Sequence, residues 1–499
     1  MKSDFNEALI LFQSRKLNEA KNICEEILKQ EVNNSQAYNL YAFILHYLEE
    51  FDSAIEYWSK AIKINPNYIE AYNGRGNAFI KLKKLDDAII NFNQAIKINP
   101  NYFEPFNNLG NIFIKLKKFD EAIINFNQVI KIKPNYAQAY HGKAYALMRS
   151  LKLDDALINF KQAIKIKPNY ADAYNSMGAT LNQLRQWEEA INCYTKTLEI
   201  NPNHKDAHEN LINLLTYYNP KKNSTNSIIK TNYLLRSNKF NFDLKNKITD
   251  EEVINYYYKI YKILKENLHN DNFDSEQIYR QNTFDLNCDR HFEVFDTYNV
   301  IPKFCFGCYK ILINPKNIIE LFKLYIVFDN LKLEKNNIRK CIIELRSSTG
   351  GVYKGLIYCS GLNEAQKILN DILPILKTSI DDNLSISIKR GCTEFSVPYP
   401  KFKEIDQSMN YNDAWKEKEK QIDDKNKNKN KNTNKILEKT ILGITISDAL
   451  IMRNWLVYAK KINDESYKKF NINIPDTKYM ENQLFGQLDH RKKEFQKIV

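Results

Sequence analysis

The chain has 499 residues, a formal net charge of +13 and 27% charged residues. This length exceeds what one hydrophobic core supports, so two or three domains are expected. The positive charge favours acidic partners or anionic surfaces. However, the basic residues are spread along the chain, so the charge alone does not indicate nucleic-acid binding.

The N-terminal sequence MKSDFNEALILFQSRKLNEA has no continuous apolar stretch, so a signal peptide is not expected. No apolar run in the sequence is long enough to span a bilayer. These two observations predict a cytoplasmic protein. In that reducing environment disulfide bonds are not expected.

The first half of the chain contains a repeated pentapeptide. INPNY occurs at 64–68 and 98–102, IKPNY at 132–136 and 166–170, and INPNH at 200–204, so that the prolines are 34 residues apart. Proline lacks a backbone N–H and restricts the residue before it, so each motif marks the end of a helix. Two helical patterns fit between successive prolines, which predicts a series of helix pairs.

Small and aromatic residues occupy the same positions in each 34-residue unit. In the unit that ends at Pro100 they are Tyr72, Gly76, Phe79, Ala88, Phe92 and Ala95. This pattern resembles the tetratricopeptide repeat (TPR), closely over residues 35–204 and loosely over residues 1–34. The resemblance implies an all-α solenoid over residues 1–218, with about six repeats and a capping helix. It also implies a concave groove that binds a partner protein or an extended peptide.

One polar side chain follows the first aromatic residue of each repeat, and two more lie one turn further on. We refer to this set as the ladder: Asn39, Asn73, Asn77, Asn107, Asn111, His141 and Asn175. An amide supplies both a hydrogen-bond donor and an acceptor, so the ladder is suited to pairing with the backbone of an extended ligand. The alternative is that these are solvated positions in an Asn-rich chain.

The second half predicts an α+β domain between less regular segments. Residues 219–248 are expected to be a linker and residues 249–300 a helical connector. Residues 301–410 contain six alternating patterns in the order β-α-β-β-α-β, which predicts a ferredoxin-like fold. These patterns cover residues 303–313, 317–333, 339–348, 352–361, 363–380 and 383–397.

Two further segments complete the chain. Residues 411–436 contain the tract WKEKEKQIDDKNKNKNKNTNK, whose composition predicts a charged low-complexity linker. Residues 437–499 are expected to form a C-terminal helical tail, which begins with an amphipathic helix over residues 437–463.

Six of the eight cysteines lie between residues 288 and 392. In a ferredoxin-like sheet the strand order is 4-1-3-2, and the first strand is antiparallel to both neighbours. That order brings four thiols to one edge of the sheet: Cys305, Cys308, Cys359 and Cys392. Four thiolates suit a zinc ion or an iron–sulfur cluster.

Two other interpretations of these cysteines remain open. Cysteine is a common small residue of hydrophobic cores, and Cys305 and Cys308 would point to opposite faces of a regular strand. The thiols of a C-x-x-C sequence can also be reactive, although reactive pairs usually lie at a helix N-terminus.

The repeats predict a protein–protein interaction adaptor. One alternative is an enzyme that acts at the cysteine edge on a substrate recruited by the repeats. A second is a nucleic-acid-binding module, which would use exposed tyrosines of the sheet. The sequence contains no Walker loop, dinucleotide-binding fingerprint, HExxH motif or nucleophile elbow, and it identifies no substrate.

Overall fold

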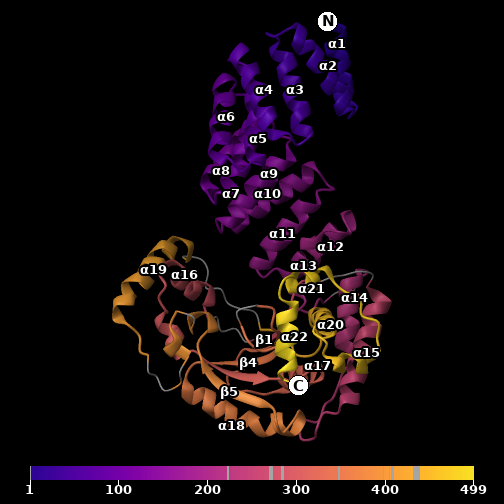
Figure 1. Ribbon diagram of the computed structural model, residues 1–499, viewed down its shortest axis with the longest axis vertical. Coiled ribbons are helices and arrows are strands. Elements are labelled where there is room, and N and C mark those ends of the chain that lie inside the picture. The colour runs from indigo at the N-terminus through magenta and orange to yellow at the C-terminus, as the bar shows by residue number, and fades with distance from the viewer. Residues whose placement is uncertain are drawn as a thin grey trace. The chain divides into compact units, whose positions relative to one another are not determined.

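The computed structural model describes residues 2–221, 224–268, 273–281, 286–346, 349–396, 398–403, 405, 409–430 and 439–498. The chain forms two compact units, Met1–Pro202 and Asn203–Val499. In Figure 1 the first unit runs from indigo to magenta and the second from magenta to yellow. No helix among the described residues combines the length and the apolar character needed to cross a membrane.

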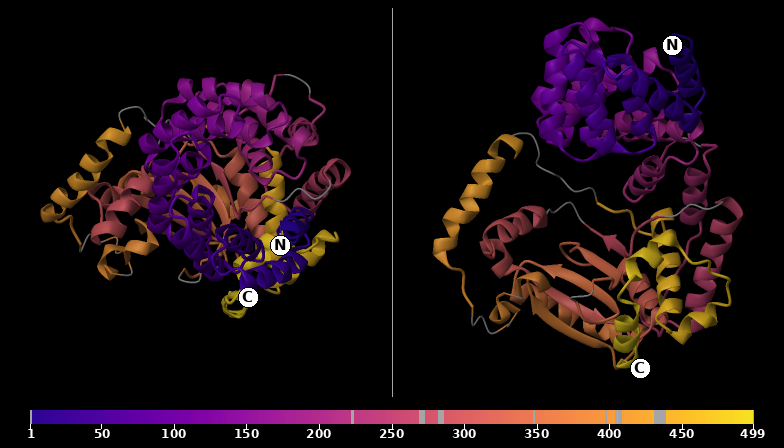
Figure 2. Two further views of the ribbon diagram at one scale, coloured as in Figure 1. Left: turned by 90° about the horizontal axis from the view of Figure 1, so that it is seen from above. Right: turned by 45° about the horizontal axis from the view of Figure 1, so that its top comes forward.

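The first unit consists of consecutive helix pairs. Its helices are α1 (Lys2–Gln13), α2 (Leu17–Gln30), α3 (Ser35–Tyr47), α4 (Phe51–Ile64), α5 (Ile69–Lys81), α6 (Leu85–Ile98), α7 (Phe103–Lys115), α8 (Phe119–Ile132), α9 (Ala137–Arg149), α10 (Leu153–Ile166), α11 (Ala171–Gln183) and α12 (Trp187–Ile200). Each helix packs against the next along the chain. The pairs follow an arc when the unit is seen along its stack (Figure 2).

The turn between the two helices of each pair contains one residue in the left-handed backbone conformation. In the third pair this residue is Lys83, with φ of 60°, and the N–H of Lys84 donates to the carbonyl oxygen of Phe79 at 2.9 Å. This bond satisfies a carbonyl group that has no partner within its own helix. The same conformation recurs every 34 residues, at Arg15, Glu49, Lys83, Lys117, Leu151 and Arg185.

The spacing of small and aromatic residues follows from close contact between helices. A Cβ atom added to Gly110 of α7 would lie 2.7 Å from the ring of Phe126 of α8, and one added to Gly142 of α9 would lie 2.4 Å from the same ring. Phe126 is fully buried between these helices. The repeated glycine is therefore required by the aromatic ring that packs against it.

The second unit is built on a small antiparallel sheet. Its strands are β1 (Gln277–Arg280), β2 (Tyr309–Asn314), β3 (Arg339–Ile343), β4 (Tyr353–Cys359) and β5 (Ser385–Arg390). The strand order is β1-β3-β4-β2-β5, and all pairings are antiparallel. Ile311 at the centre of β2 lies opposite Ile357 of β4 and Ile388 of β5. The strand β2 therefore lies between the third and fourth of the strands predicted from the sequence.

Helices cover the sheet and surround it. The helix α17 (Ile318–Asn330) contacts β3 and β4, whereas α18 (Leu362–Ser379) contacts β2 and β4. The two helices also contact each other, so they share one face of the sheet. The other helices of this unit are α13 (Lys205–Leu214), α14 (Ser227–Ser237), α15 (Asp250–Asn267), α16 (Cys288–Tyr298), α19 (Lys416–Asn430), α20 (Ile446–Lys461), α21 (Lys478–Leu484) and α22 (Leu488–Gln496).

The segment 219–248 is not simply a linker, because it contains α14. This helix begins at an N-cap, Asn226, whose side chain accepts from two backbone N–H groups, and it buries Ile228 and Leu235. The Oδ1 atom of Asn232 accepts a hydrogen bond from the backbone N–H of Ile446 at 2.9 Å. The prediction of a linker was wrong because the polar residues before Asn226 resemble a linker, and the short helix that follows them is stabilised by residues distant in the sequence.

The C-terminal segment is part of the core rather than a tail. The helix α20 contacts β1, α13, α14, α15 and α17, and Trp455 in its centre is fully buried. Its polar residue Asn454 is also buried and donates to the carbonyl oxygens of Phe273 and Ser275, both at 2.9 Å. Polar positions in this helix therefore do not mark a solvent-facing side, which is why the amphipathic interpretation was wrong. The yellow helices lie beside the sheet in Figures 1 and 2.

Two further predictions need correction. The described part of the low-complexity segment 411–436 includes α19, where Asp423 accepts two hydrogen bonds from Arg290 at 2.7 and 2.8 Å. Residues 431–436 lie outside the described residues. In addition, the predicted first strand is shorter, because Lys303–Gly307 forms a 3-10 helix before β2 begins.

Candidate functional site

The ladder lies on the first helices of the pairs, and some of its side chains form hydrogen bonds with other side chains of the repeats. The Oδ1 atom of Asn39 accepts from the indole Nε1 of Trp58 at 3.0 Å, and Asn39 is 9% exposed. The Nδ2 atom of Asn108 donates to Oδ1 of Asn73 at 3.3 Å and to Oδ1 of Asn77 at 3.0 Å. These bonds fix the orientation of three side-chain amides on α5 and α7.

Two ladder residues, Asn73 and His141, also lie close to the tyrosine that precedes the next first helix. The Nδ2 atom of Asn73 lies 3.5 Å from the hydroxyl of Tyr102, and the ring of His141 lies 5.1 Å from the ring of Tyr170. Burial raises the pKa of both tyrosines to about 12. Each of these tyrosines is the last residue of the repeated pentapeptide, and that position was not predicted to be part of the site.

The ladder residues differ in their exposure to solvent. Asn111 is exposed, and Asn107 and Asn175 are partly exposed. The Nε2 atom of His141 lies 3.3 Å from the hydroxyl of Ser176, and burial lowers the pKa of His141. The ladder therefore combines partly open amides with a neutral imidazole at physiological pH.

The two cysteines of the C-x-x-C sequence lie close together at the start of β2. Cys305 is within the 3-10 helix and Cys308 caps it, and the N–H of Cys308 donates to the carbonyl oxygen of Cys305 at 3.2 Å. Residues three apart in a 3-10 helix lie on the same side. The expectation that they point to opposite faces was based on a regular strand, which is not formed here.

The other two candidate cysteines are at the same edge of the sheet. Cys359 lies opposite Tyr309 in the register of β2 and β4. On the other side of β2, the N–H of Gly391 donates to the carbonyl oxygen of Cys308 at 2.7 Å, one residue before Cys392. Cys392 accepts a hydrogen bond at Sγ from the ammonium group of Lys310, at 3.3 Å.

The surroundings of these thiols resemble a core more closely than a metal site. Cys305 packs against Ile301, Phe395 and Phe402. Burial raises the pKa of Cys305, and it is the main cause that raises the pKa of Cys359 to about 12. Among the described residues no group of three or more His, Cys, Asp or Glu side chains is placed to hold a metal ion. The zinc or iron–sulfur site stays a prediction.

The charged residues between β3 and β5 form ion pairs with one another. Glu344 is fully buried and accepts from Nε of Arg346 at 2.9 Å and from the ammonium of Lys354 at 2.8 Å. Arg346 also donates to Glu394 at 2.6 Å. Burial alone would raise the pKa of Glu344, but these two cations lower it to about 2. These ion pairs therefore link the segment after β3 to Lys354 of β4 and to the segment after β5.

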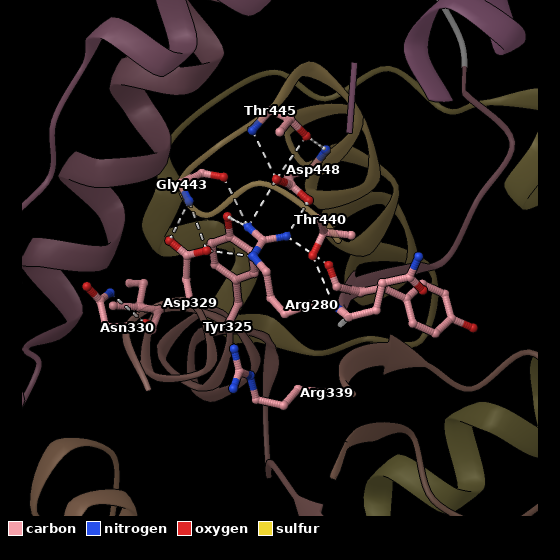
Figure 3. A network of polar contacts seen from close by, with 12 residues as sticks. Arg280, Tyr325, Asp329, Asn330, Arg339, Thr440, Gly443, Thr445 and Asp448 are labelled. Carbon is pink, nitrogen blue, oxygen red and sulfur yellow. Dashed lines mark hydrogen bonds and ion pairs between the residues drawn. The ribbon is translucent and has the colours of Figure 1, made fainter. Parts of the chain in front are cut away.

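A buried ionic network in the second unit was not foreseen from the sequence. Arg280, at the end of β1, is 4% exposed and lies between two carboxylates (Figure 3). Its Nε donates to Asp329 at 2.5 Å, and its Nη1 and Nη2 donate to the two oxygens of Asp448, both at 3.2 Å. Nη2 also donates to the hydroxyl of Tyr325 at 2.7 Å. The network joins β1, α17 and α20, which are far apart in the sequence.

Comparison with known proteins identifies the repeats of the first unit. A family model described as TPR repeat matches residues 44–83, 76–117 and 152–184. A second model, described as tetratricopeptide repeat, matches residues 103–136 and 171–204. No curated protein matches the chain.

Several solved structures of TPR proteins are similar to part of the chain. YrrB, described as a TPR protein with an unusual peptide-binding site, is 23% identical, and the match covers 37% of this chain and 95% of YrrB with a TM-score of 0.33. MamA is 24% identical over 32% of this chain and 92% of its own, with a TM-score of 0.30.

A third match is the C-terminal part of a TPR repeat-containing protein from Cytophaga hutchinsonii. It is 17% identical over 54% of this chain and 96% of its own, with a TM-score of 0.39. The two family models and the 34-residue pattern identify the repeats. The N-terminal region of this chain contains tetratricopeptide repeats.

Proposed function

We propose that this protein is an adaptor that binds an extended peptide segment of a partner protein along the first helices of its repeats. The TPR repeats support a protein-interaction role. The observation that carries the proposal is the ladder, which places one amide or imidazole side chain on the first helix of successive repeats, two of them beside a partly buried tyrosine. The partner is defined by its extended backbone and not by a particular side chain.

The contacts within the ladder explain how it would bind. The side chain of Asn108 donates hydrogen bonds to the side-chain Oδ1 atoms of Asn73 and Asn77. The orientation of those two amides is therefore fixed before a ligand binds. Fixed side chains lose less conformational entropy on binding, which favours affinity. A backbone with one N–H and one C=O per residue can use such donors and acceptors along its length.

For the second unit we propose a ferredoxin-like domain with one additional strand. The elements β2, α17, β3, β4, α18 and β5 follow one another in the order β-α-β-β-α-β, and their strands are arranged β3-β4-β2-β5. The additional strand β1 pairs with β3 at the edge. We also propose a cytoplasmic location, which is consistent with eight cysteines that are all free.

The test is peptide selection on the full-length protein, followed by affinity measurement. Peptides from a random display library would be selected and their dissociation constants measured by fluorescence anisotropy. The variant Asn73→Ala/Asn111→Ala is expected to weaken binding about 10-fold or more, because each lost charge-neutral hydrogen bond contributes about 1 kcal/mol.

The matched control removes two asparagines from the second helices. Asn93 and Asn127 are exposed on α6 and α8, so the variant Asn93→Ala/Asn127→Ala should bind the selected peptides as the unchanged protein does. Equal affinity of the Asn73→Ala/Asn111→Ala variant would contradict a role for the ladder. Strong salt-dependent binding of RNA by the full chain would instead favour the nucleic-acid alternative.

A further inference from the structure

The second unit contains a cavity of about 400 Å³ that the adaptor role does not use. It lies between the segment that follows α14, the end of α17 and residues 442–444. One part of its wall is aromatic. The rings of Phe240 and Phe242 both pack edge-on against Tyr256, with centroids 4.4 and 5.5 Å apart. A volume of this size is within the range of roughly 300–1,000 Å³ found for small-molecule sites.

The cavity is also lined by cationic side chains, Arg236, Lys239 and Lys332. The lysines are exposed at the rim, whereas the Nη1 atom of Arg236 is buried and has no hydrogen-bond partner among the residues that the structure describes. A buried guanidinium nitrogen without an acceptor is costly, because it has lost its bonds to water. The position of Arg236 therefore suits an anionic group in the cavity.

The charges behind the cavity wall also leave an excess of positive charge. Arg236 interacts electrostatically with Asp329, Asp448 and Arg280, and Arg339 interacts with Arg280 and Asp329. These five residues contain three guanidinium groups and only two carboxylates.

Arg339 is the second guanidinium in this cluster that is incompletely paired. It is 1% exposed, and its Nε and Nη1 atoms have no hydrogen-bond partner within the described part of the chain. Its Nη2 donates to Asn336 at 3.2 Å. Burial lowers the pKa of Arg339 to about 10. A buried cluster with an uncompensated positive charge destabilises a fold, so an added anion would relieve that cost.

The remaining polar lining consists of side-chain amides, the hydroxyl groups of Tyr256 and Tyr325, and one carboxylate. Asn238, Asn241 and Asn330 line the cavity together with Asp329. Asp329 is already engaged, because both its oxygens accept from the N–H of Gly443 at 3.0 Å. Amides can donate to and accept from the edge of a heterocyclic ring.

We infer that this cavity binds a small organic anion with a flat, unsaturated body. Its carboxylate or phosphate group is directed to Arg236, with Lys239 and Lys332 at the rim, and its ring packs on Phe240 and Phe242. The cations supply charge-assisted hydrogen bonds, the rings supply apolar area, and the amides select the edge of the ring.

The inference is tested by calorimetric titration of the full-length protein with three probes. Adenosine monophosphate and indole-3-acetate carry a ring with a phosphate or a carboxylate, and inorganic phosphate carries the charge alone. At least one of the two organic anions is expected to bind with a dissociation constant below about 100 μM, and inorganic phosphate at least about 10-fold more weakly. Which organic anion binds identifies the head group.

Variants separate the two parts of the site. Arg236→Gln is expected to weaken binding of the organic anion about 10-fold or more and to leave the melting temperature equal or higher, because it removes a buried Nη1 atom that has no hydrogen-bond partner among the described residues. Phe240→Leu keeps the charge and removes the ring, so it should also weaken binding, and it serves if Arg236→Gln does not fold. Lys230→Gln, at an exposed position of α14 outside the cavity, is the matched control and should bind normally.

Three results would overturn the inference. The first is that neither organic anion binds at about 1 mM. The second is that inorganic phosphate binds as tightly as the organic anions, which would exclude a role for the aromatic wall. The third is that Arg236→Gln, or Phe240→Leu in its place, binds the organic anion as tightly as the unchanged protein.

Discussion

Polar side chains are paired at very different distances along the chain in the two units. In the repeats, Asn73 pairs with Tyr102 and Asn108, which are 29 and 35 positions away, so each contact joins neighbouring repeats. In the second unit, Arg280 pairs with Asp448, which is 168 positions away. The repeats are thus stabilised by contacts between neighbours, whereas the second unit depends on contacts that close the whole fold.

This difference predicts different responses to damage. A defect in one repeat weakens that repeat and its two neighbours, because stability in a solenoid is a sum of local terms. A defect in the Arg280 network affects β1, α17 and α20 together, because they share one buried charge. Four substitutions or conditions test this comparison, from the largest expected effect to the smallest.

The largest effect is expected for Asp448→Asn. It leaves the buried guanidinium of Arg280 with one carboxylate instead of two, so the free energy of unfolding of the second unit should fall by about 3–5 kcal/mol. Hydrogen exchange measured by mass spectrometry should increase in the second unit and stay unchanged in α1–α12. The control is Asp476→Asn, because Asp476 pairs with Lys461 near the surface and should cost less than about 1 kcal/mol. Equal loss of protection in both units would contradict the comparison.

The next effect is expected at low pH, through Glu344. Its pKa of about 2 lies below the ordinary value of 4.5, so its ionised form stabilises the folded state above pH 4.5. That contribution is lost as the pH falls from about 4.5 towards 2, and about 2 kcal/mol should be lost at pH 3. Urea unfolding at pH 7, 4.5 and 3 measures this loss. In Glu344→Gln the free energy of unfolding should fall by about 2 kcal/mol less between pH 7 and pH 3. An equal fall in the variant and the unchanged protein would exclude Glu344 as the source.

A substitution in the repeats should have an effect of similar size that stays local. In Gly110→Ala the added methyl group meets the ring of Phe126 at 2.7 Å, so we expect a cost of about 1–3 kcal/mol despite the better helix propensity of alanine. Hydrogen exchange should increase in α7, α8 and α9 and stay unchanged in the sheet. The control is Asn93→Ala, at an exposed position of α6. A Gly110→Ala protein as stable as the control would mean that α7 moves away without cost.

The smallest effect is expected for Cys305→Ala. If the thiol only packs against Phe395 and Phe402, its loss should cost about 1 kcal/mol and leave the metal content unchanged. Elemental analysis and an absorption spectrum of protein purified without oxygen provide the measurement. About one zinc per chain, or a visible iron–sulfur band, that disappears in this variant would instead establish the four-thiolate site.

The sequence predicted the repeat unit well because its signals are local. Pro100 ends a helix because proline has no backbone N–H group. Gly76 is small because the ring of Phe92 packs directly on it. The proline recurs every 34 residues, so one error would not change the interpretation. Even in the repeats, the sequence did not show that the side chain of Asn39 accepts a hydrogen bond from the indole of Trp58.

The second unit was less predictable because its polar residues have distant partners. Asp448 and Asn454 indicated a solvent-facing side of α20, yet their partners are Arg280 and backbone carbonyl groups of residues 273 and 275. The four-residue strand β1 is too short to give a periodic signal. The 3-10 helix around Cys305 could not be distinguished from the beginning of a strand, because both are apolar and contain few residues.

The position of α20 has a consequence for the order in which the protein is made. A ribosome releases the repeats first, and they can fold on the nascent chain because their contacts are between neighbours. The carboxylate of Asp448 emerges 168 residues after Arg280, so the second unit cannot complete its core until α20 has been synthesised. During translation, the repeats are therefore expected to fold before the remainder of the protein has folded.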